Sequence, residues 1–164
     1  MPSGRLTKMT DSTETDWIRI AITSQLVMLI YFTIDNHAYL YPWNNLRSPA
    51  AELPSTLAGW IPFFLIMLAF AFRMHWGMLV GTVYTYVWLL LQIRQWWIPY
   101  LFGPTPLHRD FSWYYEHGYT ETLKVLPPIG DHPIPDLQHM ILQLLSLIVV
   151  VTATVACYKS WGVR

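Results

Sequence analysis

Polar and ionisable residues gather at one end of three of the four long apolar stretches in this chain. They are Asp35 and His37 at the end of the first stretch, Gln92, Arg94, Gln95 and Trp96 near the end of the third, and Gln138, His139 and Gln143 at the start of the fourth. In an up-and-down helical protein these three ends lie at the same depth in the membrane. Ionisable groups near a bilayer cost free energy and are commonly kept for a function. We therefore expect these residues to meet in one pocket.

Acid–base chemistry is the reaction type that these residues could support. Asp35, His37 and His139 are the candidate catalytic residues, because a carboxylate can orient an imidazole and raise its basicity. An isomerase-like or hydrolase-like reaction on a lipid could use such a pair, although nothing in the spacing selects one reaction. The candidate ligand-binding residues are Gln92, Arg94, Gln95, Trp96, Gln138 and Gln143.

Helical spacing supports the convergence of these groups. Asp136, His139 and Gln143 are separated by three and four residues, so they share one face of a helix, and Gln92 and Gln95 do the same. A purely structural explanation stays open. Amide and imidazole side chains also join membrane helices by hydrogen bonds worth about 1 kcal/mol each, and Asp136 could simply cap its helix.

A metal site is the sharper alternative for the histidines. Imidazole with carboxylate suits zinc, iron or copper, but no HExxH or similar fixed-spacing motif is present. The sequence therefore assigns no metal ligand, and it identifies no cofactor.

The composition predicts an integral membrane protein. Hydrophobic residues make up 54% of the 164 residues and charged residues only 12%, against about 25% charged in soluble domains. The 26 aromatic residues, nine Trp, ten Tyr and seven Phe, fit two interfacial belts. A formal net charge of zero gives no reason to expect a nucleic-acid partner. The single cysteine, Cys157, excludes an internal disulfide.

The apolar stretches predict an all-α fold, an integral membrane four-helix up-and-down bundle. The expected spans are about 17–35, 57–74, 77–102 and 136–158, within one transmembrane domain over 17–164. Residues 1–16 are polar and are expected to form a mobile cytoplasmic tail. Six of the ten Lys and Arg residues fall on the side of the two termini, so both termini are expected in the cytoplasm.

The loop between the third and fourth spans is too long for a plain connector. Thr105-Pro106 offers a helix start and Gly118 a helix stop. We therefore expect a partly helical extracytoplasmic loop, with a short surface helix between them, that covers the pocket.

The leading functional prediction is a small multi-pass membrane protein whose outer-face pocket binds a lipid-like or small hydrophobic ligand, with acid–base chemistry as an extension. The alternative is a non-enzymatic accessory or immunity-type subunit that docks a larger membrane complex. Expected partners are the lipid bilayer, a lipid-like ligand, and either a membrane protein or further copies of the chain. In architecture alone the chain resembles small four-helix membrane proteins that hold sterol-like ligands, on the acidic residue Asp35 at the end of the first span. This resemblance assigns no site residue.

Overall fold

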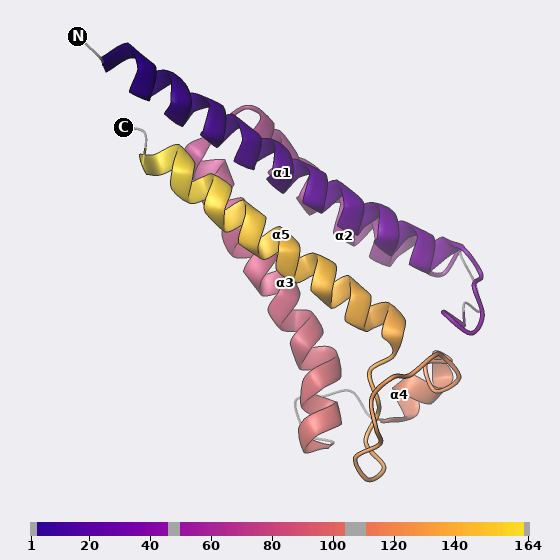
Figure 1. The fold of residues 1–164 in the computed structure, drawn as a ribbon. Helices are drawn as coiled ribbons and strands as arrows, with labels where there is room; N and C mark the ends of the chain where they lie inside the picture. The colour runs from indigo at the N-terminus through magenta and orange to yellow at the C-terminus, as the bar shows by residue number, and fades with distance from the viewer. Residues whose placement is uncertain (1–2, 46–49, 104–110, 163–164) are drawn as a thin grey trace.

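The computed structural model describes residues 3–45, 50–103 and 111–162. Its helices are α1 Ser3–His37, α2 Leu53–Ala71, α3 His75–Phe102, α4 Phe111–Glu116 and α5 Leu137–Gly162 (Figure 1). No strand occurs among these residues, and Lys124 and Asp136 form an isolated bridge. The predicted all-α class is confirmed for the part of the chain that is described.

Four of the helices are long and apolar enough to cross a membrane. The qualifying segments are Thr13–His37, Leu53–Ala71, His75–Phe102 and Leu137–Trp161, of 19 to 28 residues. At about 1.5 Å per residue they match a hydrocarbon core of about 30 Å. Their composition fits the predicted multi-pass membrane protein.

The boundaries of α2 differ from the predicted span 57–74. The helix begins at Leu53, because Pro54 lies in its first turn, where a missing N–H is harmless. It ends at Ala71, and Arg73 then takes a positive φ of 51° that reverses the chain. The next helix, α3, begins at His75, so three residues join the two helices where the predicted spans leave two.

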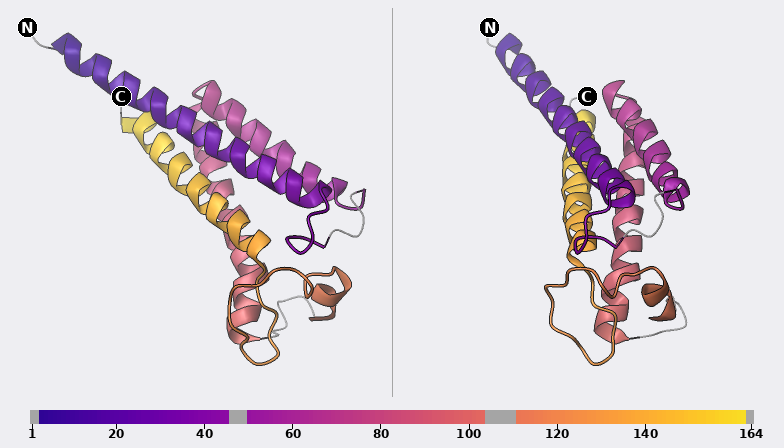
Figure 2. Two further views of the ribbon diagram at one scale, coloured as in Figure 1. Left: turned by 45° about the vertical axis from the view of Figure 1, so that its right-hand side comes forward. Right: turned by 90° about the vertical axis from the view of Figure 1, so that its right-hand side faces the viewer.

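The first helix extends over most of the segment expected to be a mobile tail. It begins at Ser3 and projects beyond the ends of the other helices (Figures 1 and 2). No Gly or Pro interrupts residues 5–16, so the helix can continue through them. Glu14, inside the predicted tail, is buried and accepts a hydrogen bond from Ser160 Oγ at 3.0 Å. Arg73 lies 3.7 Å from the same carboxylate oxygen.

The long helices pack in the order α2, α1, α5, α3, with α2 and α3 also in contact. The chain termini and the α2–α3 turn lie at one end, which we call the terminal end. The described loop residues 38–45, 50–52 and 117–136 lie at the other end together with α4, and we call this the loop end (Figure 2). Gly81 lets α3 approach α2 closely, since a Cβ added there would lie 2.8 Å from Ile66 Cγ2.

Large apolar side chains also cover the outer surface of the helices. Leu65 is 60% exposed and Val80 is 67% exposed. The interior is apolar too, with Phe63, Met28 and Val149 almost completely buried. Helices that are apolar on all sides are typical of a lipid environment.

The loops at the loop end are held together by main-chain hydrogen bonds. Leu123 N donates to Pro42 O at 2.9 Å, and Leu137 N donates to Leu123 O at 2.8 Å. The loop helix α4 spans only six residues, and the predicted start at Thr105-Pro106 lies outside the described residues. Gly118 follows α4 with a φ of 77°, a conformation that favours glycine.

Candidate functional site

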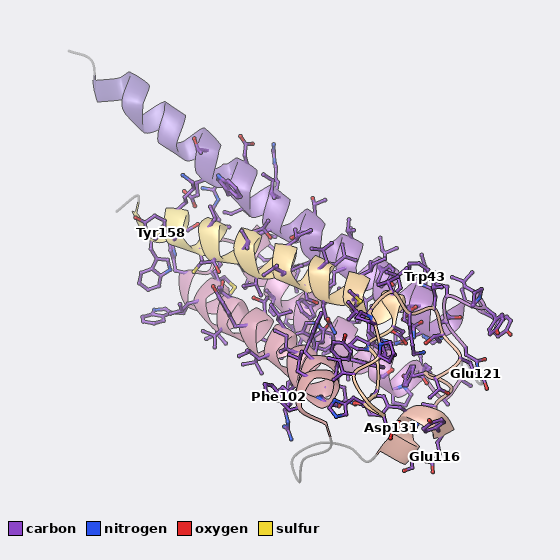
Figure 3. The ribbon with its side chains drawn as sticks, turned by 60° about the horizontal axis from the view of Figure 1, so that its bottom comes forward. Trp43, Phe102, Glu116, Glu121, Asp131 and Tyr158 are labelled. Carbon is purple, nitrogen blue, oxygen red and sulfur yellow. The ribbon has the colours of Figure 1, made fainter. Side chains whose placement is uncertain are left out.

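A cavity of about 340 Å³ lies at the loop end, between the end of α1, the start of α5 and the turn that follows α4. Its size falls within the range of about 300–1,000 Å³ that is usual for small-molecule pockets. Figure 3 shows Trp43, Glu116 and Glu121 at this end of the molecule and Tyr158 at the opposite end. The lining residues are mostly polar: Asp35, Asn36, Asn44, Asn45, Ala51, Glu52, Glu116, His117, Tyr119, Gln138 and His139.

Asp136 anchors the wall of this cavity. It is completely buried, and its carboxylate accepts hydrogen bonds from His139 N at 3.0 Å, Thr122 Oγ1 at 2.9 Å and Gln138 Nε2 at 3.1 Å. It also contacts His139 Nδ1 at 2.6 Å. Burial opposes ionisation, but the His139 imidazole and these hydrogen bonds hold the pKa of Asp136 below its ordinary value. Asp136 thus acts as an ionised cap of α5 that positions two cavity residues.

His139 is fixed by contacts on several sides. Its ring lies 4.1 Å from the Trp96 ring, tilted by 36°, and Tyr119 meets it edge-on at 5.1 Å. An ionised carboxylate can only accept, so Nδ1 carries the proton that is shared with Asp136. Nε2 is then the ring nitrogen left to act at the cavity wall. A carboxylate that positions an imidazole in this way suits a general base.

Asp35 and Gln138, which line the cavity, each have a buried side-chain oxygen without a hydrogen-bond donor among the described residues. Asp35 is 9% exposed and its Oδ1 is buried without a partner, while its main-chain oxygen accepts from Asn44 Nδ2 at 2.8 Å. Gln138 is 3% exposed, and its Oε1 is likewise buried without a partner. Because Gln138 Nε2 donates to the Asp136 carboxylate, the orientation of this amide is determined.

The two helices that carry these oxygens are joined next to them. Tyr31, one turn before Asp35 on α1, donates its hydroxyl to the main-chain oxygen of Gln138 at 2.8 Å. Asp35 and Gln138 therefore reach one cavity from helices that are directly linked.

Several predicted site residues lie elsewhere. His37 Nε2 is 2.9 Å from Thr56 Oγ1 on α2. Gln92 donates to Ser146 Oγ at 2.9 Å, and Gln143 accepts from Trp97 Nε1 at 2.6 Å, so both join α3 to α5.

The remaining residues from the third span are also outside the cavity lining. Arg94 is exposed. The main-chain oxygen of Gln95 accepts the Tyr114 hydroxyl, and Gln95 Nε2 is buried without a partner. Trp96 reaches the site indirectly, by packing on His139. The structure thus brings Asp35, Gln138 and His139 together, with Trp96 behind them.

Other cavity residues were not selected from the sequence. Glu52, Glu116 and Tyr119 lie on or beside connecting segments, and the sequence does not specify the path of such segments. Tyr31 precedes Asp35 by four residues, so helical spacing could have identified it.

Among residues 3–45, 50–103 and 111–162, no three His, Cys, Asp or Glu side chains form a group that could hold a metal ion. The carboxyl, amide and imidazole groups of the cavity lining can form hydrogen bonds, attract charge and transfer protons. No protein-family model matches the chain, and neither a curated protein nor a solved structure is significantly similar to it.

Proposed function

We propose that this chain is a small multi-pass membrane protein that binds a lipid-like or other small ligand in the loop-end cavity. Asp35, Gln138 and His139 contact the ligand, and Asp136 positions the latter two. The proposal rests on one observation: two residues of the cavity lining, on different helices, each have a buried side-chain oxygen without a donor among the described residues. Leaving such a group unpaired costs about 1–3 kcal/mol, and a ligand that donates hydrogen bonds removes this cost.

The position of the cavity supports a ligand that approaches along the membrane surface. It lies where apolar helices end and polar loops begin, so a polar group can enter it while an attached apolar part stays at the boundary. Under the proposed orientation this is the outer face of the membrane. If the ligand is a substrate, His139 is the general base.

Thermal unfolding of the full chain in phosphatidylcholine nanodiscs tests the proposal. A panel of small neutral, anionic and cationic molecules is screened for compounds that raise the unfolding midpoint. At least one class is expected to stabilise the natural chain and Asp16→Asn, but not Asp35→Asn. Asp16 is a matched control because its side chain is 66% exposed near the terminal end. A panel in which no compound depends on Asp35 contradicts the proposal.

A docking role is the second candidate, and the aromatic surface at the terminal end favours it. Trp76 is 72% exposed and Tyr158 is 78% exposed, and Trp76 meets Trp161 edge-on at 5.3 Å. Purification in mild detergent tests it. A stoichiometric membrane-protein partner that is lost in Trp76→Ala but kept in Asp35→Asn supports docking, whereas a chain purified alone contradicts it.

A further inference from the structure

The cavity lining is acidic. Asp35, Glu52 and Glu116 contribute carboxyl groups, and none of the described lining residues is Lys or Arg. Lys124 is close to Asp136, but its Nζ donates to three main-chain oxygens, those of Tyr119, Thr120 and Thr122, at 2.7, 3.0 and 3.1 Å. These contacts use all three N–H bonds of the Lys124 ammonium, so it donates to none of the three lining carboxyl groups, which favour positive charge.

The three carboxyl groups lie at different degrees of burial. Asp35 is buried, Glu52 is half-buried and Glu116 is exposed. The lining thus offers a cation carboxyl groups at an exposed, a half-buried and a buried position, and Asp35 is the most buried of them. Electrostatic attraction is strongest there, because little water screens it.

The two buried oxygens without a donor indicate which chemical group the ligand presents. Asp35 Oδ1 and Gln138 Oε1 both need a hydrogen-bond donor. Given the proposed binding function, on which this step rests, we infer that the ligand presents an ammonium group with N–H bonds to Asp35 and Gln138.

Other ligand classes fit this wall less well. A quaternary ammonium has the charge but no N–H, so the two oxygens stay unpaired. A neutral alcohol or amide supplies a donor but no positive charge for the three carboxyl groups of the lining. A carboxylate or phosphate next to the amine would be repelled by Glu52 and Glu116. The geometry thus selects primary or secondary amines that carry no nearby anion.

Such an amine can be a free molecule or the headgroup of an amphiphile. We first test whether an ammonium group, which both sources share, binds to the full chain in phosphatidylcholine nanodiscs at constant ionic strength. The probes are 1,4-diaminobutane, 1,4-butanediol and tetramethylammonium. They differ in charge and in N–H content.

We expect 1,4-diaminobutane to raise the unfolding midpoint of the natural chain and of Asp16→Asn, while the other two probes do not. Asp35→Asn should weaken its binding about tenfold or more, because a charged hydrogen bond is worth about 1.5–3 kcal/mol and 1.4 kcal/mol is a factor of ten. Glu52→Gln, at a half-buried position, should weaken binding by a smaller factor. This second variant keeps the test decisive if Asp35→Asn folds poorly.

Phosphatidylcholine nanodiscs that also contain octadecylamine, a lipid amine without a phosphate, distinguish the two sources. If a lipid headgroup occupies the site, this lipid raises the midpoint in an Asp35-dependent manner and reduces the response to 1,4-diaminobutane. If the ligand is a free amine, the lipid changes neither quantity.

Three results would overturn the inference. Equal stabilisation by 1,4-butanediol removes the need for charge, and equal stabilisation by tetramethylammonium removes the need for N–H donors. In both cases an Asp35-dependent response would leave the binding function standing. No response to any probe in the natural chain overturns the ammonium inference alone, provided that another compound class in the wider panel still shows Asp35-dependent stabilisation.

Discussion

Replacing Asp136 should destabilise the loop end more than any other single change at a polar residue there. Its buried carboxylate is the common acceptor for Thr122 Oγ1, Gln138 Nε2 and both His139 N and Nδ1. Asp136→Ala leaves one buried donor, on Gln138, and two partly buried donors, on His139, without their partner, while Thr122 retains its hydrogen bond to Tyr119 O. Breaking a buried charged cluster in this way typically costs about 3–5 kcal/mol.

Asp136→Asn keeps the shape but removes the charge, and it points an amide N–H₂ toward existing donors. We expect a loss of about 2–3 kcal/mol, in line with one charged hydrogen bond and one mismatched donor. The assay is reversible unfolding in mixed micelles, followed by tryptophan fluorescence. Asp16→Asn, at the exposed position near the terminal end, should change the unfolding free energy by less than about 0.5 kcal/mol.

The stability that the Asp136 carboxylate contributes should depend on pH. The pKa of Asp136 in the folded chain lies below its ordinary value of 3.8, so its ionisation stabilises the fold above that value. This stability is lost as the pH falls through the lower, folded-state pKa. The natural chain and Asp136→Asn should therefore converge in stability below about pH 4. Equal stability at pH 7, or a difference that persists unchanged in acid, would refute the reasoning.

Three further predictions concern helix packing. Gly81→Ala should destabilise the chain by about 1–3 kcal/mol, because the added methyl meets Ile66 at 2.8 Å. In the unfolding assay, a second substitution, Ile66→Ala, should recover part of this loss. Additive effects of the two substitutions would contradict the contact. Glu14→Ala should cost about 1–2 kcal/mol, since Ser160 Oγ loses a buried acceptor; an unchanged unfolding free energy would argue that Glu14 is solvated. Trp97→Phe should lower the unfolding free energy by about 1 kcal/mol, because Gln143 loses its hydrogen-bond donor. Trp76→Phe, at an exposed position, is the control. Equal effects of the two substitutions would contradict the prediction.

The helices could be predicted from the sequence because long apolar stretches dominate their formation. Their ends could not be placed as well. Pro54 fits the first turn of α2, so the helix begins before the predicted start at residue 57. After α2, Arg73 reverses the chain with a positive φ, a conformation that its residue type does not indicate. The polar composition of residues 5–16 suggested a tail, yet nothing in that segment prevents a helix, and Glu14 finds buried partners on other elements.

Some residues of the candidate site could also be placed from the sequence, and others could not. Asp35 and His139 could be placed at one end of the bundle from span order alone. His37 could not be assigned with them, because two residues turn a helix by about 200°, which directs it to Thr56 on α2. Gln92 and Gln143 sit on the faces where α3 meets α5, so they join helices. Glu116 and Tyr119 depend on the loop path, which long-range hydrogen bonds determine.

The proposed function requires that Asp35 and Gln138 line one acidic cavity that is open to small cations. The most direct test is the rate at which Gln138→Cys, in a Cys157→Ala background, reacts with aminoethyl and sulfonatoethyl methanethiosulfonate. The cationic reagent should react faster than the anionic one by about tenfold or more, and Asp35→Asn should reduce that ratio. An unreactive thiol, or equal rates for both reagents, would contradict the claim.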